Sequence, residues 1–153
     1  MGGATELVHA TCIALDDRGV LIRGPSGSGK SDLALRCLTI GTNGLHARPM
    51  MLVADDQVAI TRQDNRLIAR APAALRGKLE VRGQGIAVLP VAESAEIFLI
   101  ADLVDESQSI ERLPDPVFTA DLCGCRLPVL RLHPFEASAA AKLFVALTMR
   151  YGR

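Results

Sequence analysis

The chain has 153 residues and a mass of 16.3 kDa, which fits a single domain, and 49% of its residues are hydrophobic. Its 17 basic and 17 acidic residues give a formal net charge of zero, so no long-range field attracts nucleic acid or anionic lipid. We therefore expect one domain over residues 1–153, with neither a nucleic-acid nor a membrane partner.

The cysteines and the N-terminal residues favour a reducing compartment. Cys12, Cys37, Cys123 and Cys125 lack the spacing of a zinc site, and buried reduced thiols are the simplest interpretation. The N-terminus lacks a basic region followed by an apolar run, and no window approaches the ~18 apolar residues of a membrane span. The sequence thus predicts a cytoplasmic protein.

In the first part of the chain, apolar runs alternate with turn residues. Residues 7–14 are mostly apolar, and residues 20–22 predict a short strand that ends at a glycine-rich loop. Apolar side chains recur at helical spacing over residues 30–38, which predicts a helix. Residues 42–49 contain Gly, Asn and Pro and predict a loop, and residues 50–54 predict a buried strand.

The second part continues the same alternation. Residues 58–60 and 67–70 flank a polar turn and predict a hairpin. Residues 97–104 are apolar enough for a central strand, residues 127–132 predict another strand, and residues 137–151 predict the longest helix. Together these patterns predict an α/β domain with a central β-sheet and flanking helices, and they leave the strand order open.

A nucleotide phosphate loop is the strongest motif. The segment Gly24–Ser31 matches G-x-x-x-x-G-K-[ST] and lies between the predicted strand and the predicted helix. Its glycines let consecutive N–H groups turn toward phosphate oxygens, while Lys30 reaches the β- and γ-phosphates and Ser31 coordinates Mg²⁺. The expected nucleotide-binding residues are Gly24, Pro25, Ser26, Gly27, Ser28, Gly29, Lys30 and Ser31. The loop alone does not separate kinase, ATPase and GTPase.

Two carboxylates follow the predicted buried strand 50–54. Asp55 and Asp56 lie where P-loop proteins hold Mg²⁺, and a carboxylate there can also accept a proton from an incoming hydroxyl. Successive residues of a strand face opposite sides, so we expect different roles for the two. The simpler alternative is that both residues only begin a turn.

Five segments match the motifs of one known family. They are Lys30–Asp32, Val53–Asp56, Leu79–Ile86, the single residue His9 and Glu111–Leu113. The segment Leu79–Ile86 reads Leu-Glu-Val-Arg-Gly-Gln-Gly-Ile and is the most family-specific. The chain resembles the catalytic domain of HPr kinase/phosphorylase, which phosphorylates a serine of the phosphocarrier protein HPr.

The resemblance implies a single P-loop kinase domain with a central mixed β-sheet, of the HPr kinase/PEP carboxykinase-like type. It implies ATP and Mg²⁺ as cofactors, HPr or a close paralogue as substrate, reverse phosphorolysis of the phosphoserine, and a homo-oligomer such as the family hexamer. The implied catalytic residues are Asp56 as the base, with Asp55, His9, Lys30 and Arg112. The implied metal ligands are Ser31, Glu80 and Asp55.

Simpler interpretations stand beside these roles. Without the family match, His9 would be a core histidine, Glu80 a solvated strand residue and Arg112 a surface arginine. A small-molecule P-loop kinase and a non-catalytic ATP-sensing module are the alternative functions.

Departures from the family pattern are also evident. We expect the family's N-terminal domain to be absent, and residues 42–49 to be an insertion of unknown role. Residues 132–136 read Leu-His-Pro-Phe-Glu where the family has an arginine-bearing Val-Arg-Pro-Gly-Arg-Asn segment. Because arginine suits phosphate through its forked donors, we expect phosphorolysis to be the weaker reaction.

Overall fold

The computed structural model describes residues 3–41, 44–45, 47–114 and 118–148. The strands and helices in these ranges follow one another along the chain as β1 Thr5–His9, β2 Thr11–Leu15, β3 Arg18–Arg23, α1 Lys30–Thr39, β4 Met51–Ala54, β5 Gln57–Gln63, β6 Arg66–Arg70, a 3-10 turn Ala73–Leu75, β7 Lys78–Val81, β8 Gly85–Val88, β9 Ala95–Leu103, β10 Thr119–Leu122, β11 Cys125–Leu132 and α2 Ala139–Thr148.

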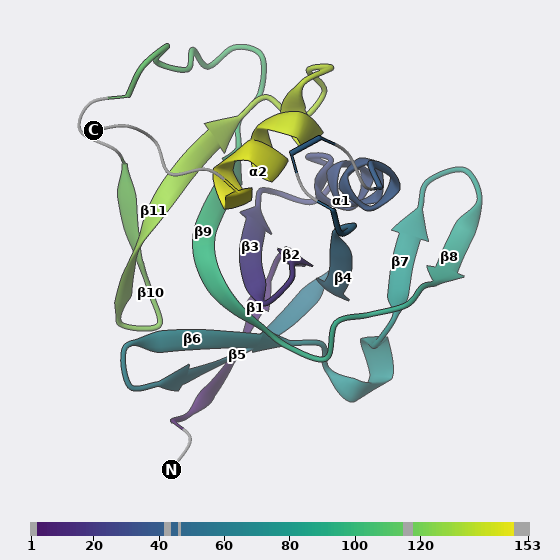
Figure 1. Ribbon diagram of the computed structural model, residues 1–153, viewed down its shortest axis with the longest axis vertical. Coiled ribbons are helices and arrows are strands. Elements are labelled where there is room, and N and C mark those ends of the chain that lie inside the picture. The colour runs from purple at the N-terminus through teal and green to yellow at the C-terminus, as the bar shows by residue number, and fades with distance from the viewer. Residues whose placement is uncertain (1–2, 42–43, 46, 115–117, 149–153) are drawn as a thin grey trace.

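A curled mixed sheet forms the centre of the molecule (Figure 1). Nine of the described strands belong to it, and its main path runs β1-β5-β6-β9-β3-β2-β4. The long strand β9 pairs in parallel with β3 and β11 and antiparallel with β6 through its first residues. The described strands β7 and β8 form a separate two-stranded hairpin beside the sheet. The predicted α/β fold and the central position of residues 97–104 are confirmed.

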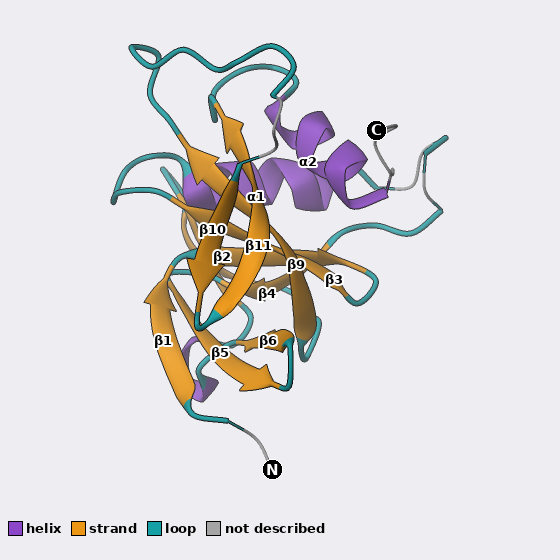
Figure 2. Cartoon of the chain, turned by 90° about the vertical axis from the view of Figure 1, so that its left-hand side faces the viewer, coloured by secondary structure: helices purple, strands orange, loops and turns teal. Residues whose placement is uncertain are grey.

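The two faces of the sheet bury different sets of apolar side chains. Strand alternation in β3 sends Val20 and Ile22 to a cluster shared with α1 and α2, and sends Leu21 to a cluster enclosed by the curled sheet. Figure 2 shows both helices on one side of the strands. The first cluster therefore packs the helix that follows the phosphate loop directly against β3.

Several carboxyl ends of strands meet at one edge of the sheet. β3, β9 and β11 are parallel, and β4 has the same direction as β3 because both pair antiparallel with β2. The chain leaves β3 at Gly24, β4 at Asp55, β9 at Val104 and β11 at His133. In open α/β sheets this is the edge at which ligands bind.

Other predicted elements are confirmed with shifted bounds, and some were missed. The helix over 30–38 is α1, and the hairpin is β5–β6. The apolar run 7–14 is two strands, β1 and β2, because the chain changes sheet partner at Ala10: β1 pairs with β5, whereas β2 pairs with β3 and β4. The predicted helix 137–151 begins at Ala139 and is described as far as Thr148.

Some predicted segments lie partly outside the described residues. Positions 42, 43 and 46 of the predicted loop do so, as do positions 149–151 of the predicted C-terminal helix. The strands β8 and β10 were not predicted, because each has only 4 residues and short runs carry little periodic signal.

The cysteines are chiefly packing residues. Cys12, Cys37 and Cys125 are buried, and Cys123 is half-buried at the turn between β10 and β11. Burial raises the pKa of the Cys12 and Cys37 thiols to about 12, so both stay protonated and unreactive near neutral pH. In the described part of the chain, neither helix has the length and apolar character needed to cross a membrane.

Candidate active site

The loop between β3 and α1 adopts a conformation that depends on its glycines. Gly27 and Gly29 have φ angles of 80° and 100°, a backbone conformation that residues with a side chain rarely adopt. A Cβ atom at Gly24 would lie 2.5 Å from the hydroxyl oxygen of Ser28. The Ser28 N–H closes the loop by donating to the carbonyl of Pro25 at 3.0 Å. The motif residues therefore curl the backbone as an anion-binding loop requires.

Lys30 and Ser28 place polar groups inside this loop. Lys30 is only 8% exposed, and its ammonium donates to the carbonyls of Gly24 at 2.7 Å and Pro25 at 3.1 Å. The Ser28 hydroxyl is buried and has no hydrogen-bond partner among the described residues. A buried hydroxyl without a partner is costly, and a phosphate oxygen in the loop would satisfy it. The donors present thus fit a nucleotide phosphate.

Asp55 is buried beside the first turn of α1. Its carboxylate accepts hydrogen bonds from the Ser31 hydroxyl at 2.8 and 3.0 Å and from the Thr11 hydroxyl at 2.8 Å. The backbone N–H of Glu80 donates to the same carboxylate at 3.3 Å. A serine hydroxyl and a carboxylate in contact form the oxygen donor set by which P-loop proteins hold Mg²⁺. The residues present therefore fit that ion.

Asp56, the next residue, has a largely exposed side chain. Its carboxylate lies 3.3 Å from Nε2 of His9, and the two side chains are 67% and 50% exposed. The Asp56 backbone has a φ of 69°, a left-handed conformation that aspartate and asparagine tolerate better than most residues. The two aspartates thus have different environments, as predicted: Asp55 is buried at the loop and Asp56 is exposed. Both follow β4, which ends at Ala54, so the left-handed turn at Asp56 and not strand alternation separates them.

Comparison with known proteins identifies the family of this chain. A family model described as "HPr Serine kinase C-terminal domain" matches residues 3–151. The chain belongs to this family. HPr kinase/phosphorylase of Malacoplasma penetrans is 32% identical over 133 residues, and that of Bordetella avium is 35% identical over 138 residues.

The matched region is a part of those relatives. It covers 80% of this chain but 42% of the Malacoplasma protein, and 84% of this chain but 42% of the Bordetella protein. Among solved structures, the HPr(Ser) kinase/phosphatase of Coxiella burnetii superposes with a TM-score of 0.74 at 27% identity, over 93% of this chain and 87% of that one. The fold of the HPr serine kinase C-terminal domain is thus present across nearly the whole chain.

The structure brings most of the predicted site residues of this HPr kinase domain together. Ser31 contacts Asp55, and Lys30 lies in the same loop. The backbone of Glu80 reaches Asp55, while its side chain is exposed, because the neighbouring Leu79 points into the core. His9 contacts Asp56.

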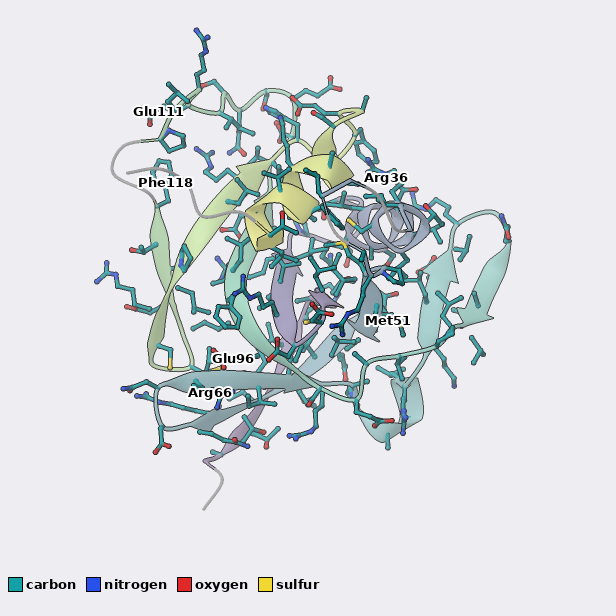
Figure 3. The ribbon with its side chains drawn as sticks, in the orientation of Figure 1. Arg36, Met51, Arg66, Glu96, Glu111 and Phe118 are labelled. Carbon is teal, nitrogen blue, oxygen red and sulfur yellow. The ribbon has the colours of Figure 1, made fainter. Side chains whose placement is uncertain are left out.

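Arg112 is the exception. It is exposed on the segment between β9 and β10, and Figure 3 places the adjacent Glu111 on the side of the molecule opposite the β7–β8 hairpin. Among the described residues, no hydrogen bond or ion pair joins Arg112 to the other predicted site residues, so its role stays a prediction.

Sequence reasoning missed the residues that support the site. Thr11 lies 44 positions before Asp55, and no local pattern connects them. Arg23, directly before the loop, donates to both oxygens of Asp102 on β9 at 2.7 and 2.9 Å, and this bond raises the pKa of the guanidinium. Parallel pairing of β3 with β9 sets Arg23 opposite Asp102, which only the strand order could reveal. This pair ties the entrance of the phosphate loop to the central strand.

Proposed function

We propose that this domain is an ATP- and Mg²⁺-dependent protein-serine kinase acting on HPr or a closely related phosphocarrier. The proposal rests on the geometry of this site. The Ser31 hydroxyl bonds to Asp55 beside Lys30, and the residue after Asp55, the exposed Asp56, contacts His9. The relatives named HPr kinase/phosphorylase support the choice of substrate. The chain spans 42% of the length of each of these relatives, so their activity enters here as a proposal.

In the proposed mechanism, the curled loop holds the phosphates of ATP by its N–H groups and by the Ser28 hydroxyl. Lys30 exchanges its bonds to the carbonyls of Gly24 and Pro25 for phosphate oxygens. Ser31 and Asp55 would hold Mg²⁺, which would supply positive charge to the transferring phosphoryl group. Asp55 keeps its orientation throughout, because Thr11 still donates to it.

Asp56 is the proposed general base. A serine hydroxyl is a weak nucleophile until a nearby carboxylate accepts its proton. The exposed carboxylate of Asp56 takes that proton as the serine oxygen bonds to the γ-phosphorus and the bond to the leaving ADP oxygen breaks. His9 contacts one carboxylate oxygen and so fixes the rotamer of Asp56. Arg112 is kept as a proposed assisting cation on the strength of the family resemblance alone.

Glu80 is proposed as a further metal ligand, and a substitution tests this role. Glu80→Gln should raise the Mg²⁺ concentration needed for half-maximal transfer, because an amide is a weaker ligand for a hard cation than a carboxylate. The backbone N–H bond to Asp55 survives the substitution. A Mg²⁺ titration of the transfer rate measures the effect, with Lys78→Gln on the same strand as the control. An unchanged Mg²⁺ titration would show that Glu80 is an ordinary acidic residue on the strand surface and not a metal ligand.

The function itself is tested by incubating the protein with radiolabelled ATP, Mg²⁺ and purified HPr. A labelled HPr band whose label is on serine supports the proposal. A labelled metabolite from a small-molecule mixture would instead indicate a small-molecule kinase, and nucleotide binding without any transfer would indicate a sensing module. Release of pyrophosphate from phosphoserine-HPr and phosphate measures the reverse reaction. We expect it to be the slower one, because His133 and Glu136 stand where the family pattern has arginines.

A further inference from the structure

An exposed aromatic ring lies against the phosphate loop. Phe135 follows β11 and is 66% exposed, which is unusual for so large an apolar side chain. A Cβ atom at Gly29 would lie 3.0 Å from Cζ of this ring, so the ring edge packs directly on the loop. Phe135 therefore presents most of its surface to solvent at the edge of the sheet where the phosphate loop opens.

The backbone on both sides of this ring is held in place. The guanidinium of Arg36, on α1, donates to the carbonyl of Pro134 and, at 3.5 Å, to the carbonyl of Glu136. The Nε of Arg36 also donates to the carboxylate of Asp32 at 3.1 Å, which fixes the guanidinium. Figure 3 shows Arg36 on α1. Helix α1 thus fixes the turn that carries the ring, although the ring itself is left uncovered.

The position of the ring matches the nucleoside end of a bound nucleotide. Ser31 and Asp55 define where the metal and the terminal phosphates lie, and Asp55 follows β4. In the sheet, β3 has β2 and β4 on one side and β9 and β11 on the other. A triphosphate with its terminal end on the β4 side therefore directs its nucleoside toward the end of β11, where Phe135 lies.

We propose that Phe135 is the surface on which the base of the nucleotide stacks. This inference rests on the proposed function, because it assumes that the loop holds a nucleoside triphosphate. Every nucleotide base can stack on an aromatic ring, since each base has a π-face. The site should consequently distinguish ATP from a bare polyphosphate much more strongly than it distinguishes ATP from GTP.

The test compares Mg²⁺-ATP with Mg²⁺-tripolyphosphate, which has the phosphates but no base. In the wild-type protein ATP should bind more tightly than tripolyphosphate by calorimetry. Phe135→Ala should weaken ATP binding about tenfold, the loss of one stacking contact, and leave tripolyphosphate binding unchanged. Phe98→Ala is the matched control: Phe98 is 44% exposed and lies near the start of β9, at the opposite end of that strand from the loop.

A second variant provides a direct signal. The chain contains no tryptophan, so Phe135→Trp places the only tryptophan at the ring position. ATP should quench its emission, and tripolyphosphate should leave it unchanged. Three results would each overturn the stacking role and leave the kinase proposal intact. They are equal affinities of the wild type for ATP and tripolyphosphate, an equal loss of affinity for both ligands in Phe135→Ala, and unquenched tryptophan emission with ATP bound. Failure of the wild type to bind either ligand would overturn both.

Discussion

Asp56→Asn is expected to lower the rate of phosphoryl transfer by ~10²–10⁴-fold, the usual cost of removing a general base. ATP binding should be unchanged, because, among the described residues, the Asp56 carboxylate contacts His9 and forms no hydrogen bond with residues 24–31. Asparagine occupies the same volume and tolerates the φ of 69° at this position, and its side-chain oxygen can still accept a bond from His9. The loss should therefore be chemical and not structural.

Single-turnover transfer to HPr and calorimetry with ATP together measure these two quantities. Asp64→Asn is a matched control, since Asp64 is another exposed aspartate with a left-handed backbone (φ 57°), in the turn between β5 and β6. Near-normal transfer by Asp56→Asn would remove this residue from the base role and point to Asp55 instead.

Lys30→Ala is expected to abolish measurable transfer and to weaken ATP binding by roughly 100-fold. The ammonium is nearly buried, and a hydrogen bond to a charged group contributes ~1.5–3 kcal/mol, which corresponds to a factor of about 10 to 150 in affinity. The substitution also removes the two bonds that Lys30 donates to the loop carbonyls, so the loop should become less ordered.

Calorimetry with Mg²⁺-ATP and the HPr labelling assay measure both effects, and circular dichroism verifies that the helices remain. The α1 helix should persist, because Leu33, Ala34 and Cys37 pack it into the core independently of Lys30. Unchanged ATP affinity together with continued labelling of HPr would contradict the assignment of residues 24–31 as the phosphate loop.

The parts of the site that the sequence predicted are those encoded by neighbouring residues. Gly24–Ser31 carries its own conformation, because its glycines permit the left-handed angles at positions 27 and 29. The different environments of Asp55 and Asp56 were predicted from strand alternation, but they arise from the left-handed backbone of Asp56 in the turn after β4, which is also a local feature.

The parts that could not be predicted depend on contacts between distant segments. Thr11 reaches Asp55 only because β2 pairs with β4, and Arg23 reaches Asp102 only because β3 pairs with β9. Strand order follows from how the apolar faces of many segments pack together, and it leaves no signature at any single residue. For the same reason, the proximity of Phe135 to Gly29, across 106 positions of sequence, was not foreseen.

The hydrogen bonds to Asp55 have a consequence for the speed of the proposed reaction. Thr11 is completely buried, and its hydroxyl together with the N–H of Glu80 selects one rotamer of the Asp55 side chain when the domain folds. The conformational entropy of that side chain is thus lost during folding and not when ligands arrive. Only the Ser31 hydroxyl has to turn from the carboxylate to a cation. On the side of the protein, cation binding then requires the rotation of one hydroxyl group, a motion of picoseconds to nanoseconds, and the slower steps are loss of water from the ion and docking of the protein substrate.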